Sequence, residues 1–145
     1  MDNILVTGGA GFVGSSLVPT LLEKGYGVEV LDDMIHENSY TGFSSYIEGR
    51  NMMSHPNFEF IRGDVRDKRL VSECVGRSDM IIHLAAIVGA PACKKNPELA
   101  RTTNVDGTRN ILKNLSSSQI IINASTGSNY GAVDGICTED TDLNP

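Results

Sequence analysis

The sequence lacks several features on which whole classes of protein depend, beginning with positive charge. It has 12 Lys and Arg residues against 18 Asp and Glu residues, and its net charge is −6. Because nucleic-acid phosphates need a basic surface, this balance argues against DNA or RNA as a partner. No apolar run approaches the length of a membrane span, and the N-terminus has neither the basic nor the apolar segment of a secretory signal. We therefore expect a cytoplasmic protein with no membrane partner.

Cysteine and histidine are also scarce. The three cysteines are odd in number and far apart, at Cys74, Cys93 and Cys137, and their spacing does not fit a set of metal ligands. The three histidines form no cluster along the sequence. These patterns predict reduced thiols rather than disulfides, and no metal site.

A glycine-rich segment near the N-terminus is the most informative part of the chain. Residues 6–14 read V-T-G-G-A-G-F-V-G, directly after an apolar run and directly before a helical pattern. Strand, turn and helix in this order are typical of a dinucleotide-binding site, where glycines permit a tight turn and the close approach of a pyrophosphate. The backbone N–H groups that open the helix then face the phosphates. The predicted cofactor-binding residues of this segment are Gly8, Gly11, Phe12, Val13 and Gly14.

The next predicted strand supports the same interpretation. It covers residues 28–31 and ends at Asp32, about 20 residues beyond the turn, where a carboxylate can accept hydrogen bonds from the ribose hydroxyls of adenosine. The alternative is a strand-end carboxylate that caps a turn. Asp32 and Asp33 would repel a 2′-phosphate, and the next basic residue is only Arg50. The predicted cofactor is therefore NAD rather than NADP.

Apolar runs and helical patterns alternate along the chain. Strands are predicted at residues 4–6, 28–31, 58–61, 80–84 and 120–122, the last of them fully buried. Helices are predicted at residues 12–24, with a bend at Pro19, at 68–75, and at 97–115; residues 33–57 are predicted to be mainly loop with one short helix. The apolar residues expected on one face of the third helix are Leu99, Val105, Ile111, Leu112 and Leu115. This alternation predicts an α/β fold, a doubly wound parallel sheet of strand order 3-2-1-4-5 in a three-layer αβα arrangement.

Four motifs occur in a fixed order and together resemble a known family. They are the T-G-G-A-G-F-V-G turn, G-D-V-R-D at residues 63–67, H-L-A-A at residues 83–86, and N-V-x-G-T at residues 104–108. The chain resembles the extended short-chain dehydrogenase/reductase superfamily, specifically its NAD-dependent epimerase/dehydratase branch. The resemblance covers essentially the whole chain but only the first half of a typical member, so the C-terminal strands and the substrate domain are expected to be missing. It implies NAD as cofactor and a nucleotide-sugar as the substrate of the full-length enzyme.

The resemblance also implies roles for residues after the third and fourth strands. Asp64 and Val65 are expected to flank the adenine, the carboxylate accepting from the exocyclic amine and the Val65 N–H pairing with a ring nitrogen. The alternative for the aspartate is a helix N-cap at Asp64 or Asp67, and both interpretations can hold together. Residues 84–86 are expected to line the cofactor with backbone and small side chains, namely Leu84, Ala85 and Ala86.

Asn104 and Thr126 complete the predicted site. The resemblance implies that Asn104 contributes to the cofactor site by organising its backbone and water; the alternative is a solvent-facing helix residue. Thr126 stands four residues before the Tyr130-Gly131 pair, and its hydroxyl is expected to bind the sugar oxygen that is oxidised or reduced. Ser125 is the neighbour that could be mistaken for it. Where 4,6-dehydratases have Asp-Glu after this threonine, the chain has Gly127-Ser128, which disfavours dehydratase chemistry and favours epimerisation through a transient keto-sugar.

The main catalytic pair of the family, Tyr-x-x-x-Lys, is absent from the sequence. None of the four tyrosines has a lysine four residues later. Residues 1–145 are therefore expected to be a dinucleotide-binding domain truncated before the catalytic helix, and unable to complete the redox cycle alone. The usual dimer helix is then missing, so a conventional dimer is not expected.

Two other functions are compatible with the same residues. The chain could be a non-catalytic NAD-binding sensor or interaction module. Alternatively, the parent enzyme could be a nucleotide-sugar reductase or decarboxylase, because these share every motif seen here.

Overall fold

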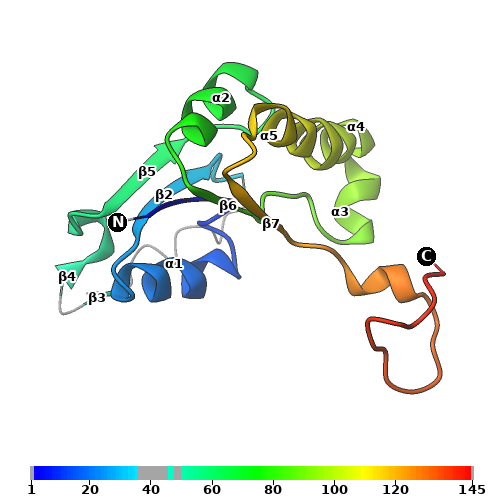
Figure 1. Cartoon of the computed structure of the whole chain (residues 1–145). Helices are drawn as coiled ribbons and strands as arrows, with labels where there is room; N and C mark the ends of the chain where they lie inside the picture. Colours follow the sequence, from blue (N-terminus) through cyan, green and yellow to red (C-terminus); the bar gives the residue numbers. More distant parts are fainter. Residues whose placement is uncertain (1, 36–45, 48–49, 145) are drawn as a thin grey trace.

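The computed structural model describes residues 2–35, 46–47 and 50–144, and its centre is a five-stranded parallel sheet (Figure 1). The strand order is β5-β2-β1-β6-β7. The strands are β1 (Asn3–Thr7), β2 (Gly27–Asp32), β5 (Phe58–Arg62), β6 (Met80–His83) and β7 (Ile120–Asn123). Since β5, β6 and β7 are the third, fourth and fifth predicted strands, the predicted order 3-2-1-4-5 and the α/β class are confirmed.

Helices cover both faces of the sheet (Figure 1). Helix α1 (Gly14–Glu23) lies on one face, and α2 (Lys68–Gly76) and α5 (Thr108–Asn114) lie on the other. Side chains alternate along each strand, so Ile4 and Val6 point to the α1 face while Leu5 points to the opposite face. Each face is therefore the base of its own hydrophobic core.

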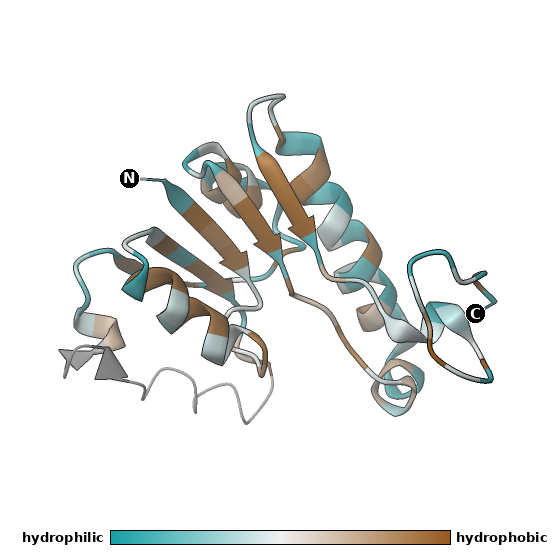
Figure 2. Cartoon of the chain, turned by 60° about the horizontal axis from the view of Figure 1, so that its bottom comes forward, coloured by the Kyte–Doolittle hydropathy of each residue, from teal (hydrophilic) through white to brown (hydrophobic). Residues whose placement is uncertain are grey.

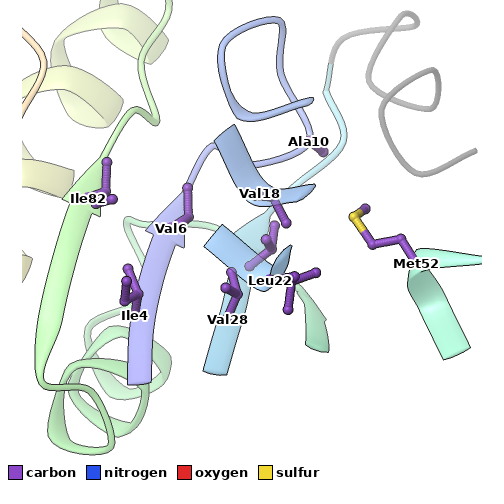
Figure 3. Close-up of a cluster of buried hydrophobic side chains, with 9 residues drawn as sticks. Ile4, Val6, Ala10, Val18, Leu22, Val28, Met52 and Ile82 are labelled. Carbon is purple, nitrogen blue, oxygen red and sulfur yellow. The ribbon is translucent and has the colours of Figure 1, made fainter. Parts of the chain in front are cut away.

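The two cores draw on the same strands from opposite sides. On the α1 face the buried side chains belong to β1, β2, β6, α1 and the residues around them (Figure 3): Ile4, Val6, Ala10, Val18, Leu22, Val28, Val30, Met52 and Ile82. On the other face the buried side chains are Leu5, Leu31, Val65, Val71, Cys74, Val75, Ile81 and Ile111. These cores fix the positions of the strand ends at which the site lies.

The first helix begins later than the sequence pattern predicts. It starts at Gly14 rather than at residue 12, and the Phe12 side chain is 95% exposed instead of packing on the sheet. Pro19 lies inside the helix, as expected. Gly25 follows the helix with φ +85°, and its N–H donates to the Leu22 carbonyl at 2.9 Å, so this glycine ends the helix.

The long helix of residues 97–115 consists of three consecutive segments. They are α4 (Pro97–Arg101), the π-helical η3 (Thr102–Gly107) and α5. The predicted apolar face is wrong in part, because Val105 and Leu112 are exposed whereas Ile111 is buried. Small and polar residues cover much of the inward face instead: Ala100, Thr103, Gly107 and Asn110. The wider π turn also shifts the side chains that an unbroken helical period would align.

Strand β7 forms one edge of the sheet, and the prediction that it is fully buried is wrong. Ile120 is 56% exposed and Ile122 is 51% exposed, and both lie beyond the part of the sheet that α1 covers. Strand β7, the edge strand, has the brown colour of apolar residues along most of its length (Figure 2). An apolar run predicts a strand, but it does not tell whether a neighbour covers it.

Several short elements lie outside the predicted ones. They are the β3–β4 pair (Tyr46–Ile47 with Arg50–Asn51), α3 (Ala90–Lys95) and the 3-10 turn η4 (Gly127–Tyr130). The short helix expected within residues 33–57 corresponds to η2 (Met52–Ser54), while residues 36–45 and 48–49 of that stretch lie outside the described residues. Among the described residues, no helix combines the length and the apolar character that a membrane span requires.

Candidate functional site

A cavity of about 620 Å³ opens at the carboxyl ends of the central strands. In a doubly wound sheet this edge, next to the point where the strand order reverses, is where ligands bind. The residues that line it come from the glycine turn and from the segments after β2, β5, β6 and β7: Gly8, Gly11, Phe12, Val13, Ser15, Leu31, Asp32, Asp33, Ile35, Gly63, Val65, Leu84, Ala85, Ala86, Ile87, Val88, Thr103, Ala124 and Ser125. Segments far apart in sequence therefore form one concave surface.

The glycine turn packs against its surroundings so closely that side chains are excluded. Gly8 has φ +70°, and a Cβ atom there would lie 2.6 Å from the Ala85 backbone nitrogen. A Cβ atom at Gly14 would collide with the Gly9 backbone. The Gly8 N–H donates to the Leu31 carbonyl at 2.9 Å, which holds the turn against β2. A side chain added at Gly8 or Gly14 would therefore displace the turn and the start of α1.

Asp32 lies at the end of β2 and faces the glycine turn. Its Oδ2 accepts from the Ala10 N–H at 3.0 Å, and its Oδ1 accepts from the Met34 N–H at 2.8 Å. The predicted turn-capping role is therefore present. A carboxylate offers about four acceptor positions, so these contacts are compatible with acceptance from a ligand hydroxyl as well.

The charge of the cavity is negative or neutral throughout its described lining. Asp32 and Asp33 are its charged residues, and no Lys or Arg is among the lining side chains that the structure describes. Within the same described ranges, no group of three His, Cys, Asp or Glu residues could hold a metal ion. The described lining therefore offers carboxylates and backbone N–H groups, and no Lys or Arg side chain, to a ligand.

The segment after β5 contributes Gly63 and Val65 to the cavity, but Asp64 turns away from it. The Asp64 carboxylate forms an ion pair with Arg66, whose Nε lies 2.9 Å from Oδ2. Hydrogen bonds from the Arg66 side chain lower the pKa of the Asp64 carboxyl. The N-cap of α2 is Asp67, which accepts from the N–H groups of Arg69 and Leu70. The N-cap interpretation is thus confirmed for Asp67, and the predicted adenine contact of Asp64 stays a prediction.

The segment after β6 forms another side of the cavity. The Leu84 N–H donates to the Thr7 carbonyl at 3.0 Å, and the chain then passes Gly8 at Ala85. Asn104 holds the next part of this segment with both ends of its amide. Its Oδ1 accepts from the Ile87 N–H at 2.8 Å, and its Nδ2 donates to the Ile87 carbonyl at 3.0 Å. Asn104 therefore organises backbone, as expected, and is no solvent-facing residue; its predicted contact with the cofactor stays a prediction.

The segment after β7 brings Ser125, and not Thr126, to the cavity lining. The Thr126 hydroxyl accepts from the Ser128 N–H at 3.2 Å and caps η4. Ser125 Oγ accepts from the Asn129 side chain at 3.2 Å. The predicted role of Thr126 toward a sugar stays a prediction, and Ser125 is the hydroxyl residue of this segment that lines the cavity.

The structure thus brings most predicted residues together but also adds unpredicted ones. Predicted residues outside the described lining are Gly14, Asp64, Asn104 and Thr126. Lining residues that sequence reasoning missed are Ser15, Leu31, Ile35, Gly63, Ile87, Val88, Thr103, Ala124 and Ser125. Sequence reasoning could have found most of these residues from their position, because they lie near the carboxyl end of a predicted strand.

The model of one protein family matches nearly the whole chain. The family is described as GDP-mannose 4,6 dehydratase, and the match covers residues 5–145.

Individual relatives agree with this match. The chain is 39% identical to a UDP-N-acetyl-alpha-D-glucosaminuronate decarboxylase of Bacillus cytotoxicus, over 95% of this chain and 40% of that protein. It is 35% identical to the low-salt glycan biosynthesis protein Agl12 of Haloferax volcanii, over 99% of this chain and 46% of that protein. The chain therefore spans less than half the length of these relatives.

A solved structure shows the same fold. It is a mutant of the UDP-glucuronic acid 4-epimerase of Bacillus cereus in complex with UDP-4-deoxy-4-fluoro-glucuronic acid and NAD. The superposition has a TM-score of 0.84 at 30% identity, and it covers 99% of this chain and 46% of the epimerase.

Proposed function

This chain belongs to the GDP-mannose 4,6-dehydratase family, within the extended short-chain dehydrogenase/reductase superfamily, and we propose that it is the NAD-binding portion of a nucleotide-sugar epimerase. The substrate and the activity of the parent enzyme belong to the proposal, because the chain spans less than half of its relatives. The observation on which it rests is the cavity at the carboxyl ends of β1, β2 and β6.

The cavity fits a dinucleotide in shape and in charge. Gly8 and Gly11 line the cavity and carry no side chain, so a pyrophosphate can approach the backbone of the turn. Helix α1 begins after Val13, whose side chain does not cap it. The Ser15 and Ser16 N–H groups donate to the carbonyls of Gly11 and Val13, so the Gly14 N–H and the positive end of the helix dipole are what would suit an anion. The carboxylates of Asp32 and Asp33, without a Lys or Arg among the described lining residues, favour ribose hydroxyls over a 2′-phosphate.

Each part of the cavity has a task in this proposal. Asp32 accepts from the adenosine ribose while it holds Ala10 of the turn. Val65 and the small Ala85 and Ala86 shape the space for the adenine and the ribose rings. Bound NAD would supply the acceptor for a hydride from the sugar. The exposed Thr126 hydroxyl, on the rim, would bind the sugar oxygen from which a proton leaves.

Turnover needs residues that the 145-residue sequence does not contain. The Tyr-x-x-x-Lys pair is absent, so we propose that this chain by itself binds NAD and does not complete a redox cycle. The same absence favours a second candidate, a non-catalytic NAD-binding module. Because one relative is a decarboxylase of Bacillus cytotoxicus, decarboxylation is an alternative reaction for the parent enzyme.

Calorimetric titration of the purified chain with NAD, and separately with NADP, tests the proposal. We expect saturable binding of NAD, weaker binding of NADP, and no effect of added UDP-glucose on NAD binding. Asp32→Asn should weaken NAD about tenfold, equivalent to about 1.4 kcal/mol, and should reduce the preference over NADP.

Asp134→Asn is the matched control, because Asp134 is an exposed aspartate outside the cavity lining. It should leave both affinities unchanged. Unfolding in urea separates a lost contact from a lost fold for each variant. A folded chain that binds no NAD would refute the proposed function.

A further inference from the structure

His83 is a buried histidine that the proposed function does not use. It is the last residue of β6, it is 4% exposed, and both of its ring nitrogens have hydroxyl partners. Its Nδ1 lies 2.6 Å from Thr7 Oγ1, and its Nε2 lies 2.9 Å from Thr108 Oγ1. The imidazole therefore bridges the end of β1 and the start of α5.

The surrounding acceptors fix the direction of these hydrogen bonds. Thr108 Oγ1 lies 2.7 Å from the Asn104 carbonyl oxygen, which can only accept, so the Thr108 hydroxyl donates there. Thr108 Oγ1 must then accept from His83, which places the proton of a neutral ring on Nε2. The bare Nδ1 accepts from the Thr7 hydroxyl, and Thr7 Oγ1 accepts in turn from the Ala85 N–H at 3.4 Å. Burial, which lowers the pKa of His83 to about 4, favours the same neutral ring.

Both ends of this chain of hydrogen bonds reach the cavity. Ala85 lines the cavity and packs against Gly8. At the other end, Asn104 holds the N–H and the carbonyl of Ile87, another lining residue. Asn104 belongs to the π-helical η3, and a π turn inside a helix is often found at a functional site.

We propose that His83 is a positioning residue of the cofactor site, which ties β1, β6 and η3 together and so places Ala85 and Ile87 on the cavity wall. The proposal rests on the proposed function, because the wall that it positions is the NAD site. His83 itself touches no ligand. Its effect on binding passes through Thr7 on one side and through Thr108 and Asn104 on the other.

Two variants of Thr108 test this chain of contacts. Thr108→Val keeps the shape of the side chain but removes the hydroxyl, so His83 Nε2–H loses its acceptor and the Asn104 carbonyl loses the hydroxyl donor. We expect the NAD dissociation constant to rise about tenfold and the exchange of the Ile87 amide hydrogen to become at least about tenfold faster. Thr108→Ser keeps the hydroxyl, and both quantities should stay close to those of the unmodified chain.

A third measurement needs no variant. Nitrogen NMR of the imidazole at neutral pH should show His83 protonated at Nε2 and bare at Nδ1, and protonation at Nδ1 would overturn the proposal. Unchanged NAD affinity in a folded Thr108→Val chain would also overturn it, as would faster exchange spread evenly over all amides, since a purely structural role predicts that result. Failure of the unmodified chain to bind NAD would refute the proposed function instead, while the ring tautomer and the Ile87 exchange would still test the hydrogen-bond chain.

Discussion

The cavity has two walls that differ in how firmly they are built. The inner wall consists of the glycine turn and the ends of β1, β2 and β6, where the strands are buried and a Cβ atom added at Gly8 or Gly14 would lie less than 3 Å from backbone atoms. The outer wall is the segment of β7 and the residues after it up to Tyr130, of which Ala124 and Ser125 line the cavity and Ile120, Ile122 and Thr126 are exposed. Residues 114–133 also contain no Asp, Glu, Lys or Arg. We therefore expect the inner wall to set the affinity for the proposed cofactor, while the outer wall presents exposed surface.

A pair of glycine substitutions should show the contrast at its largest. Gly14→Ala places a Cβ atom against the Gly9 backbone, which cannot move aside as a side chain can. We expect a loss of at least about 3 kcal/mol in the free energy of unfolding. Gly127→Ala in the outer wall meets nothing within 4 Å and should change stability by less than about 0.5 kcal/mol. Urea unfolding measures both, and equal losses would contradict the comparison.

Two isoleucines in one row of the sheet differ in burial but not in residue type, so they isolate the effect of burial on the free energy of unfolding. Ile82 and Ile122 are paired in register on adjacent strands, but Ile82 is 7% exposed and Ile122 is 51% exposed. Ile82→Ala should cost about 2–5 kcal/mol, whereas Ile122→Ala should cost less than about 1 kcal/mol. A large loss at Ile122, measured by urea unfolding at low protein concentration, would mean that the outer wall is covered in solution.

Much of this architecture follows from the sequence, because strong local patterns specify it. Continuous apolar runs identify the strands, and the glycines that must avoid Ala85 and Gly9 identify the turn. The exposure of β7 could not be predicted, since three isoleucines read alike whether or not a neighbour covers them. Whether Ser125 or Thr126 lines the cavity depends on where η4 begins, which the sequence pattern did not predict. The hydrogen bonds of His83 depend on side chains 76 and 25 residues away in sequence.

The inner wall should also give stability a pH dependence through His83. Burial lowers the pKa of His83 to about 4 in the folded chain, against 6.5 for an ordinary histidine. Above pH 6.5 the ring is neutral in both states. As the pH falls below 6.5 the unfolded chain takes up a proton that the folded chain refuses, so stability decreases. Between pH 7 and pH 5 we expect this histidine to cost about 2 kcal/mol.

The free energies of unfolding of the unmodified chain and of His83→Gln are measured in urea at each pH. Taking their difference cancels the contribution of the carboxyl groups, which both chains share. The difference should shrink as the pH falls from 7 to 5. His55→Gln controls for the removal of an imidazole elsewhere. A pH-independent difference for His83→Gln would show that the ring is not kept neutral by the fold.

The smallest effect is expected at the outer wall. Thr126→Ala removes a hydroxyl that caps η4 and does not line the cavity, so the NAD dissociation constant should change less than about twofold. Calorimetric titration with NAD measures this change, and the unmodified chain under the same conditions provides the comparison. A tenfold loss of NAD affinity would mean that Thr126 contributes to the cofactor site. The two walls would then differ less in their contribution to NAD binding.

The π-helical η3 can also be described as an insertion. A π turn takes one residue more than an α turn, so the helix of residues 97–114 is equivalent to a regular helix with one extra residue between α4 and α5. Deletion of the exposed Val105 would return the segment to the ordinary period while both flanking segments keep their orientation on the sheet. The placement of Asn104 thus depends on the number of residues between α4 and α5. A change in chain length of one residue would be enough to move it.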